Sequence, residues 1–162
     1  MQRVVSFRPA TDADRSFLYE VYASTRQEEM AQVPWDAASV QAFLTMQFEA
    51  QHQHYHTYYA AADYLIIMID DQPAGRLYVD RRQHELHVLD IALLPAYRNA
   101  GIGTALLQDL MVEAGATGRP MRLYVEPFNQ ALRLYQRLGF TKIGEEGLYL
   151  FMQWVPPGVS AD

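Results

Sequence analysis

The residues best suited to chemistry lie between a predicted strand and a predicted helix. Residues 98–104 read Arg-Asn-Ala-Gly-Ile-Gly-Thr, so that Arg98, Gly101 and Gly103 are spaced as Arg-x-x-Gly-x-Gly. The first N–H groups of a helix have no intrahelical acceptor, and glycines keep side chains out of the way of a ligand. The helix dipole favours negative charge at the same end. The pattern therefore predicts a backbone site for an anion such as a pyrophosphate, with Arg98 adding a planar charge suited to phosphate oxygens.

Two common nucleotide-binding motifs do not fit this segment. A P-loop requires a lysine before its Ser or Thr, whereas Gly103 is followed directly by Thr104. A dinucleotide fingerprint requires a third glycine, and Leu106 occupies that position. A tight strand-to-helix turn without any ligand remains an alternative for the glycines taken alone.

The elements that must position this segment follow from hydrophobic periodicity and capping signals. Thr11 with Asp14 resembles a capping box, and Asp36 is a second N-cap candidate, so a helix is expected after each. Residues 51–59 show no clear period, and residues 70–73 are expected to form a turn. Further helices are expected at residues 104–116 and after Asn129, and strands at residues 4–8, 64–69, 75–79, 85–94, 121–125, 141–144 and 149–154.

This order predicts an α/β fold with a mixed central sheet of about six to seven strands and flanking helices. The late strand–helix–strand order needs crossover helices, so the later part of the sheet is expected to be parallel. We expect a single domain over residues 1–155 and a flexible tail over residues 156–162.

Composition narrows the class of protein. The chain has 162 residues, a net charge of −6 and no cysteine, which argues against a general nucleic-acid binder and excludes cysteine chemistry. The N-terminus lacks the apolar run of a signal peptide, and the longest apolar run, residues 65–69, is too short to span a bilayer. The sequence therefore predicts a cytoplasmic protein without nucleic-acid or membrane partners.

The residues around the glycine motif resemble the GCN5-related N-acetyltransferase (GNAT) superfamily. Its signature Gln/Arg-x-x-Gly-x-Gly/Ala is matched by Arg98, Gly101 and Gly103, and residues 90–98 look typical of the strand and turn that precede it. The resemblance covers residues 66–154. A second, weaker motif follows in the expected order, comprising Asn129, Ala131, Leu134, Tyr135, Leu138, Gly139 and Phe140.

The resemblance implies acetyl-CoA, or another acyl-CoA, as co-substrate, with no metal. The pantetheine arm would run along the strand edge at Ile91, Ala92 and Leu93, held by backbone hydrogen bonds much like an added strand. Asn129 would lie beside the cofactor, although a plain helix N-cap explains it equally well. The pyrophosphate would bind backbone N–H groups of Arg98, Asn99, Ala100, Gly101, Ile102, Gly103 and Thr104.

The resemblance also implies direct acyl transfer to a primary amine. Tyr135 matches the position of a general acid that supports the leaving sulfur, and a core tyrosine is the alternative reading. Asp90 ranks first as the base, Glu85 second and His87 third, although a solvated or structural role explains each of them better when taken alone and water could serve instead. The backbone N–H of Leu93 is the expected oxyanion donor.

The acceptor is expected to be a small-molecule amine, with a protein or peptide amine as the alternative. A non-catalytic acyl-CoA-binding sensor is a further alternative from another class.

The three histidines at 52, 54 and 56 are expected to be solvated rather than metal-binding. The strand at residues 149–154 could support a homodimer. Aromatic and Met side chains that could wall an acceptor pocket, or simply pack, are Trp35, Met46, Phe48, Tyr55, Tyr58 and Tyr59.

Overall fold

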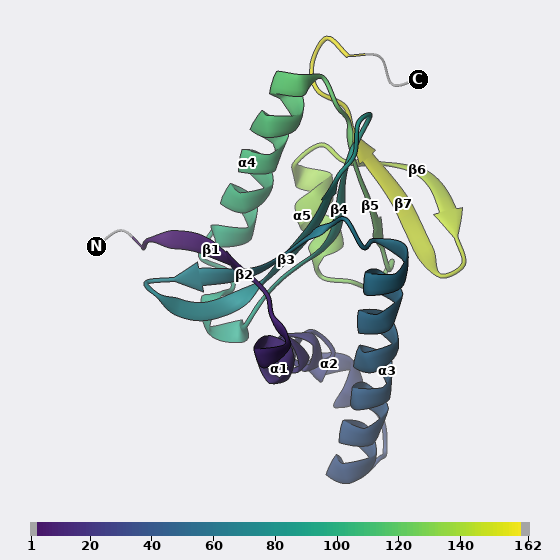
Figure 1. Cartoon of the computed structure of the whole chain (residues 1–162). Coiled ribbons are helices and arrows are strands. Elements are labelled where there is room, and N and C mark those ends of the chain that lie inside the picture. The colour runs from purple at the N-terminus through teal and green to yellow at the C-terminus, as the bar shows by residue number, and fades with distance from the viewer. Residues whose placement is uncertain (1–2, 160–162) are drawn as a thin grey trace. The chain divides into compact units, whose positions relative to one another are not determined.

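Residues 3–159 are described by a computed structural model, in which the chain divides into two compact units. The first unit comprises residues up to Leu77 together with Ile91–Arg98, and the second comprises Tyr78–Asp90 and residues from Asn99 onward. Figure 1 labels the elements of both units. The last three residues of the predicted tail, 160–162, lie outside the described residues.

Seven strands form one mixed sheet, which confirms the predicted α/β class. The strand order is β1-β2-β3-β4-β5-β7-β6, and the pairing of β4 with β5 is parallel, as the crossover argument required. The pairings β1–β2, β5–β7 and β6–β7 are antiparallel. The strands are β1 Val5–Pro9, β2 Asp63–Ile69, β3 Gln72–Arg81, β4 Leu86–Leu93, β5 Met121–Val125, β6 Thr141–Glu146 and β7 Tyr149–Trp154.

The first unit holds the N-terminal helices α1 (Arg15–Thr25), α2 (Gln27–Met30) and α3 (Ala37–Tyr58). The predicted capping box is present before α1, because the N–H of Thr11 donates to Asp14 Oδ2 at 2.8 Å. Asp36 caps α3 as predicted, accepting from the N–H of Ser39 at 2.7 Å. The buried side chains of these helices are Leu18, Val21, Tyr22, Met30, Leu44 and Phe48.

Helix α3 extends through residues 51–58, where the sequence shows no clear period. A tertiary contact explains the extension: the hydroxyl of Tyr64 in β2 lies 2.9 Å from the carbonyl oxygen of Tyr55 and 2.7 Å from that of Tyr59. The hydroxyl thereby ties the end of α3 to β2, in addition to the bond of 2.7 Å that the N–H of Tyr59 donates to the Tyr55 carbonyl. The last turns have no strong apolar stripe because they are largely exposed, with Tyr58 71% accessible.

The turn between β2 and β3 is tighter than the four residues predicted. Asp70 and Asp71 both have positive φ, at 50° and 64°, and β3 already begins at Gln72. Two consecutive left-handed residues match the twist of a hairpin, and Asp tolerates this region better than most residues. The carboxylate of Asp70 also accepts the N–H of Val4 at 2.9 Å, which ties the turn to the start of β1.

The second unit holds α4 (Ile102–Thr117) and α5 (Ala131–Arg137). Helix α4 begins two residues before the predicted start, because Gly101 takes a left-handed conformation (φ 80°) and serves as its N-cap. Its other end is closed by left-handed Gly118, as predicted. Strand β5 alternates between buried and more exposed residues, and its buried side chains belong to the same core as those of α4: Ile102, Leu106, Leu107, Leu110, Ala114, Met121, Leu123 and Val125.

Strand β6 is the last strand of the sheet and is irregular. Its register with β7 shifts between Lys142 and Gly144, so that Ile143 lies in a bulge and is half exposed. Within residues 3–159, no helix combines the length and the apolar character that a bilayer crossing requires.

The ion pair before α1 predicts a loss of stability in acid. The Arg8 guanidinium, 2.8 Å from Asp14, and the N–H of Thr11 lower the pKa of Asp14 to about 2. A lowered carboxyl pKa stabilises the fold above the unfolded pKa of about 4, and this contribution is lost as the pH falls from about 4 to 2. Urea unfolding across this range should show a loss of up to about 2 kcal/mol that Asp14→Asn abolishes. A wild-type-like acid slope in Asp14→Asn would contradict this assignment.

Candidate cofactor and active site

The first turn of α4 presents backbone N–H groups without an acceptor in the helix. The first intrahelical bond runs from the N–H of Ala105 to the carbonyl of Gly101 at 3.0 Å, so Ile102, Gly103 and Thr104 precede the hydrogen-bond ladder. No side chain caps the helix at Gly101. None of the described residues caps the N-terminus of this sixteen-residue helix with a side chain, so that end is open. The helix dipole favours an anion there.

Gly103 has no packing reason to be a glycine. A Cβ built there would meet only Leu134 Cδ2, at an ordinary 3.8 Å, and the residue lies inside a helix, where alanine is preferred. The missing side chain therefore leaves room on the outer side of the helix for a ligand to approach the backbone. The same distance places the first turn of α4 beside α5.

Arg98 does not extend its guanidinium away from the protein. Its Nε donates to the carbonyl oxygen of Leu93 at 2.8 Å, and its Nη2 donates to Ser24 Oγ at 2.9 Å, both within the first unit. Burial lowers the pKa of Arg98 from its ordinary value, and Glu28 opposes this shift. The side chain predicted to meet a phosphate is thus occupied by protein acceptors.

The last residues of β4 pack closely against β3 in the first unit. The N–H of Leu94 donates to the carbonyl of Ala74 at 2.8 Å. A Cβ on the neighbouring Gly75 would come within 2.2 Å of the carbonyl oxygen of Ala92, so only a glycine fits there. The register of β4 with β5 comprises Leu86–Val88, whereas β4 continues to Leu93. The strand edge predicted for the pantetheine lies in this continuation.

Tyr135 is buried in α5, directly after the Leu134 that faces Gly103. Burial raises the pKa of its phenol well above the ordinary value, and the negative charges of Asp90 and Glu126 raise that pKa further. The charge of Asp90, the first-ranked base, therefore acts on the predicted acid within the second unit. The raised pKa keeps the phenol protonated, as a hydrogen-bond donor must be.

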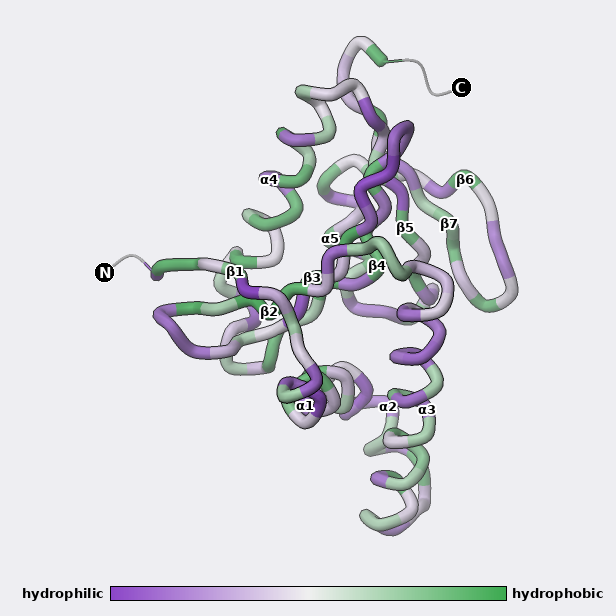
Figure 2. Tube along the Cα trace, viewed as in Figure 1, coloured by the Kyte–Doolittle hydropathy of each residue, from purple (hydrophilic) through white to green (hydrophobic). Residues whose placement is uncertain are grey.

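The other two base candidates have structural neighbours in the second unit. Glu85 accepts hydrogen bonds from Arg82 at 2.9 Å and from Arg122 at 3.4 Å, near the hydrophilic tip between β3 and β4 (Figure 2). His87 is buried, and the loss of solvent lowers the pKa of its imidazole, so it is neutral at pH 7. The ion pairs give Glu85 a structural explanation, and His87 is held as a neutral ring in the core.

Asn129 lies at the start of α5. Its Oδ1 accepts the N–H of Ala131 at 2.9 Å, the capping role considered as an alternative, and its Nδ2 donates to Glu126 at 3.2 Å. Glu126 was missed by the sequence reasoning, although an acidic residue directly after a predicted strand was a usable signal. Ser24 and Gly75 gave no signal, because their partners are remote in sequence.

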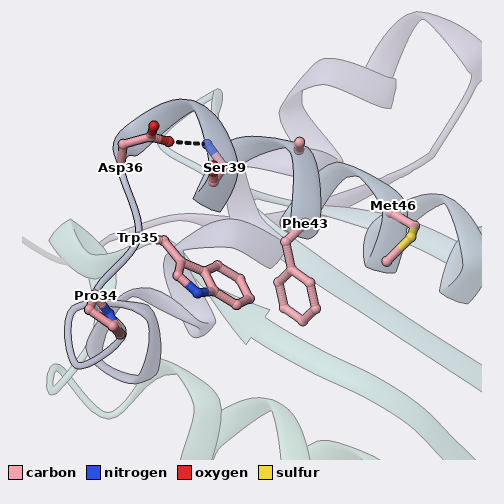
Figure 3. A pocket seen from close by; sticks show the side chains of 7 residues that line it. Pro34, Trp35, Asp36, Ser39, Phe43 and Met46 are labelled. Carbon is pink, nitrogen blue, oxygen red and sulfur yellow. Dashed lines mark hydrogen bonds between the residues drawn. The ribbon is translucent and has the colours of Figure 1, made fainter.

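An open hollow of about 660 Å³ lies in the first unit at the start of α3. Figure 3 shows the rings of Trp35 and Phe43 side by side, with Met46 further along α3 and the Asp36 carboxylate bonded to Ser39. The two rings make an edge contact with centroids 5.4 Å apart. Trp35 and Met46, both predicted as possible pocket walls, therefore line a hollow.

The remaining predicted wall residues lie elsewhere in the first unit. Phe48 is core, with only 1% of its surface exposed, whereas Tyr55, Tyr58 and Tyr59 contact the ring of His54 near the other end of α3. The rings of His52 and His56 lie 4.4 Å apart. Among residues 3–159, no group of three or more His, Cys, Asp or Glu side chains is arranged to hold a metal ion.

The family follows from the sequence match. Residues 18–140, about three quarters of the chain, match the acetyltransferase (GNAT) family. The chain belongs to the GNAT family. This matched region contains most of α1, the helices α2 and α3, the open start of α4 and the Tyr135 helix, and it confirms the resemblance drawn from the two motifs.

Solved structures show the same GNAT fold. The PaiA N-acetyltransferase from Thermoplasma acidophilum, determined in complex with coenzyme A, superposes with a TM-score of 0.69 at 18% identity, covering 94% of this chain and 99% of that one. The ribosomal-protein-S18-alanine N-acetyltransferase from Escherichia coli gives a TM-score of 0.60 at 19% identity, covering 98% of both chains.

Curated relatives match over shorter segments. An N-alpha-acetyltransferase from Sulfurisphaera tokodaii is 40% identical over 60 residues, which is 35% of this chain and 36% of the relative. An N-acetyltransferase from Schizosaccharomyces pombe is 40% identical over 45 residues, 28% of this chain and 31% of the relative. The aligned segments thus span about a third of each curated relative.

Gly103→Glu tests the site at the open start of α4, because it places a side chain and a negative charge beside the free backbone N–H groups. The affinity for coenzyme A, measured by titration calorimetry, should fall at least about tenfold, because the carboxylate repels a phosphate and occupies the approach to the backbone. Gly115→Glu is the matched control in the same helix, since a Cβ there meets open space, and it should leave that affinity unchanged. Equal coenzyme A affinity in both variants would contradict a site at Gly103.

Proposed function

We propose that the protein is an acetyl-CoA-dependent N-acetyltransferase that moves the acetyl group directly to a primary amine of a small molecule. One observation carries the proposal: the uncapped first turn of α4 lies beside α5, which holds the buried Tyr135. The two would supply an anion site and a proton donor within the second unit. Membership of an acetyltransferase family supports this assignment.

The chain would offer a backbone site for each part of the cofactor. The N–H groups at the start of α4 and in the preceding turn, from Asn99 to Thr104, would bind the pyrophosphate. The N–H of Arg98, also predicted to take part, instead donates to the carbonyl of Pro95 at 3.2 Å. The Ile91–Leu93 segment of β4 would hold the pantetheine arm as an added strand would be held. Asn129 would act here through the helix start that it caps. No metal enters the proposed reaction.

The reaction needs three provisions from the protein. An alkyl amine is mostly protonated at pH 7, with a pKa near about 10.4, so a base must remove a proton before attack. The thioester carbonyl becomes an oxyanion, for which the N–H of Leu93 is the proposed donor. The departing thiolate needs a hydrogen bond or a proton, for which Tyr135 is the proposed donor, while Asp90 is the proposed base.

The charge of Asp90 would couple the two proton transfers. Burial raises the pKa of Tyr135 most, and the charge of Asp90 raises it further. Once Asp90 takes a proton from the amine, that charge is neutralised and the pKa of Tyr135 falls. The phenol would therefore become a better donor at the stage when the sulfur leaves.

The hollow at the start of α3 supports a small-molecule amine as the acceptor. Trp35 and Phe43 offer aromatic surface, and Asp36 offers a carboxylate; aromatic faces and carboxylates both attract an ammonium group. A protein or peptide amine is the second candidate, because the Sulfurisphaera tokodaii relative is named an N-alpha-acetyltransferase.

Thiol release from acetyl-CoA across a panel of amines tests the proposed function. The panel should contain mono- and polyamines, aromatic amines, amino acids and peptides with free N-termini. We expect turnover with at least one small amine, and preferred turnover of peptides would establish the second candidate. Coenzyme A binding by calorimetry without turnover of any amine would instead establish a non-catalytic sensor.

Tyr135→Phe should lower kcat by about 10²- to 10⁴-fold, because it removes the proposed donor to the sulfur. Coenzyme A affinity should stay within about threefold of wild type, since the ring still fills its site. Asp90→Asn should lower kcat in the same way and weaken its dependence on pH. Tyr124→Phe, on the more exposed side of β5, is the matched control and should leave kcat unchanged. An unchanged kcat in Tyr135→Phe would rule out the acid role.

A further inference from the structure

We propose that Arg98 and Gly75 are positioning residues that aim the backbone N–H of Leu93, and that the Arg98 side chain is not the cation for the cofactor's phosphates. The inference rests on the proposed function, in which the Leu93 N–H stabilises the oxyanion. It concerns the first unit alone, where Leu93 lies between two peptide planes that are each held from outside β4.

The peptide that follows Leu93 is held at both ends. Its carbonyl oxygen, that of Leu93, accepts the Nε of Arg98 at 2.8 Å, and its N–H, that of Leu94, donates to the carbonyl of Ala74 at 2.8 Å. A hydrogen bond to a charged donor is shorter and stronger than a neutral one. The plane therefore cannot turn without breaking two hydrogen bonds.

The peptide that precedes Leu93 is held by close packing. Its carbonyl oxygen, that of Ala92, lies where Gly75 leaves no room for even a methyl group, with a built Cβ only 2.2 Å away. The N–H of Leu93 belongs to this same rigid plane, so its direction follows from the position of the Ala92 carbonyl. Together the two planes restrict both backbone dihedrals of Leu93.

Arg98 is itself anchored to α1. Its Nη2 donates to Ser24 Oγ at 2.9 Å, and the hydroxyl of Ser24 donates onward to the carbonyl of Val21 at 2.7 Å. Because the single hydroxyl proton is used by Val21, the Ser24 oxygen is left to accept from the guanidinium. The planar guanidinium of arginine donates to two acceptors at once in a fixed geometry. The ammonium group of lysine cannot reproduce that geometry.

The two roles of Arg98 predict opposite patterns in Arg98→Gln and Arg98→Lys. A phosphate-binding cation affects ground-state affinity, so Arg98→Gln would weaken coenzyme A binding, lower its salt dependence and be rescued by Arg98→Lys. A positioning role affects the transition state, so both variants should lower kcat by about 10- to 100-fold. Coenzyme A affinity at low and at high salt should then stay within about threefold of wild type.

Ser24→Ala tests the anchor without touching the charge. It should lower kcat by about three- to tenfold, in the same direction as the Arg98 variants, and leave coenzyme A affinity unchanged. Gly75→Ala should also lower kcat, because its methyl group displaces the Ala92 carbonyl. It acts on the peptide that precedes Leu93, whereas Arg98 acts on the peptide that follows it. If Gly75→Ala fails to fold, the Arg98 and Ser24 variants still decide the question.

Amide hydrogen exchange of the free protein gives a readout that needs no turnover. In Arg98→Gln the N–H of Leu94 should exchange at least about tenfold faster than in wild type, whereas the amide of Ile67 in β2 should be unaffected. If no amine is turned over by wild type, the proposed function fails, and the exchange rate and the coenzyme A affinity still decide the role of Arg98. Unchanged exchange of Leu94, or a tenfold weaker coenzyme A affinity restored by lysine, would overturn the inference.

Discussion

Backbone N–H groups in the first turn of an α-helix must find their acceptors outside that helix, and α4 leaves Ile102, Gly103 and Thr104 in this position. A structural helix would meet this constraint with a Ser, Thr, Asp or Asn cap, as α3 does with Asp36. Here the cap is a left-handed glycine without a side chain. The burial of Ile102 and Leu106 fixes the direction of the helix, so the open end is held rigidly.

The placement of charge follows from this arrangement. Because the guanidinium of Arg98 is bound to Leu93 and Ser24, an anion at α4 would meet backbone dipoles rather than a mobile side chain. Fixed dipoles need no reorganisation when a ligand binds, and they lose no side-chain entropy. The positive charge of Arg98 instead holds the backbone at the end of β4 through the carbonyl of Leu93.

The sequence predicted those features that depend on neighbours along the chain. The glycine motif, the Asp36 cap, β5 and the Gly118 stop follow from local backbone preferences, and all appear in the structure as expected. The end of α3 could not be predicted, because the hydroxyl of Tyr64, from a separate strand, holds it. The orientation of Arg98 could not be predicted either, because its hydrogen-bond partner Ser24 lies 74 positions away in the sequence.

The bulge in β6 has a consequence for the behaviour of the chain in concentrated solution. An edge strand exposes backbone groups that another molecule can use to extend the sheet into an aggregate. In β6 the shifted register at Ile143 interrupts the straight run of donors and acceptors, and Lys142, Glu145 and Glu146 make the strand charged. A regular β6 with neutral residues would present a template for intermolecular stacking, whereas this irregular and charged edge resists the addition of a foreign strand.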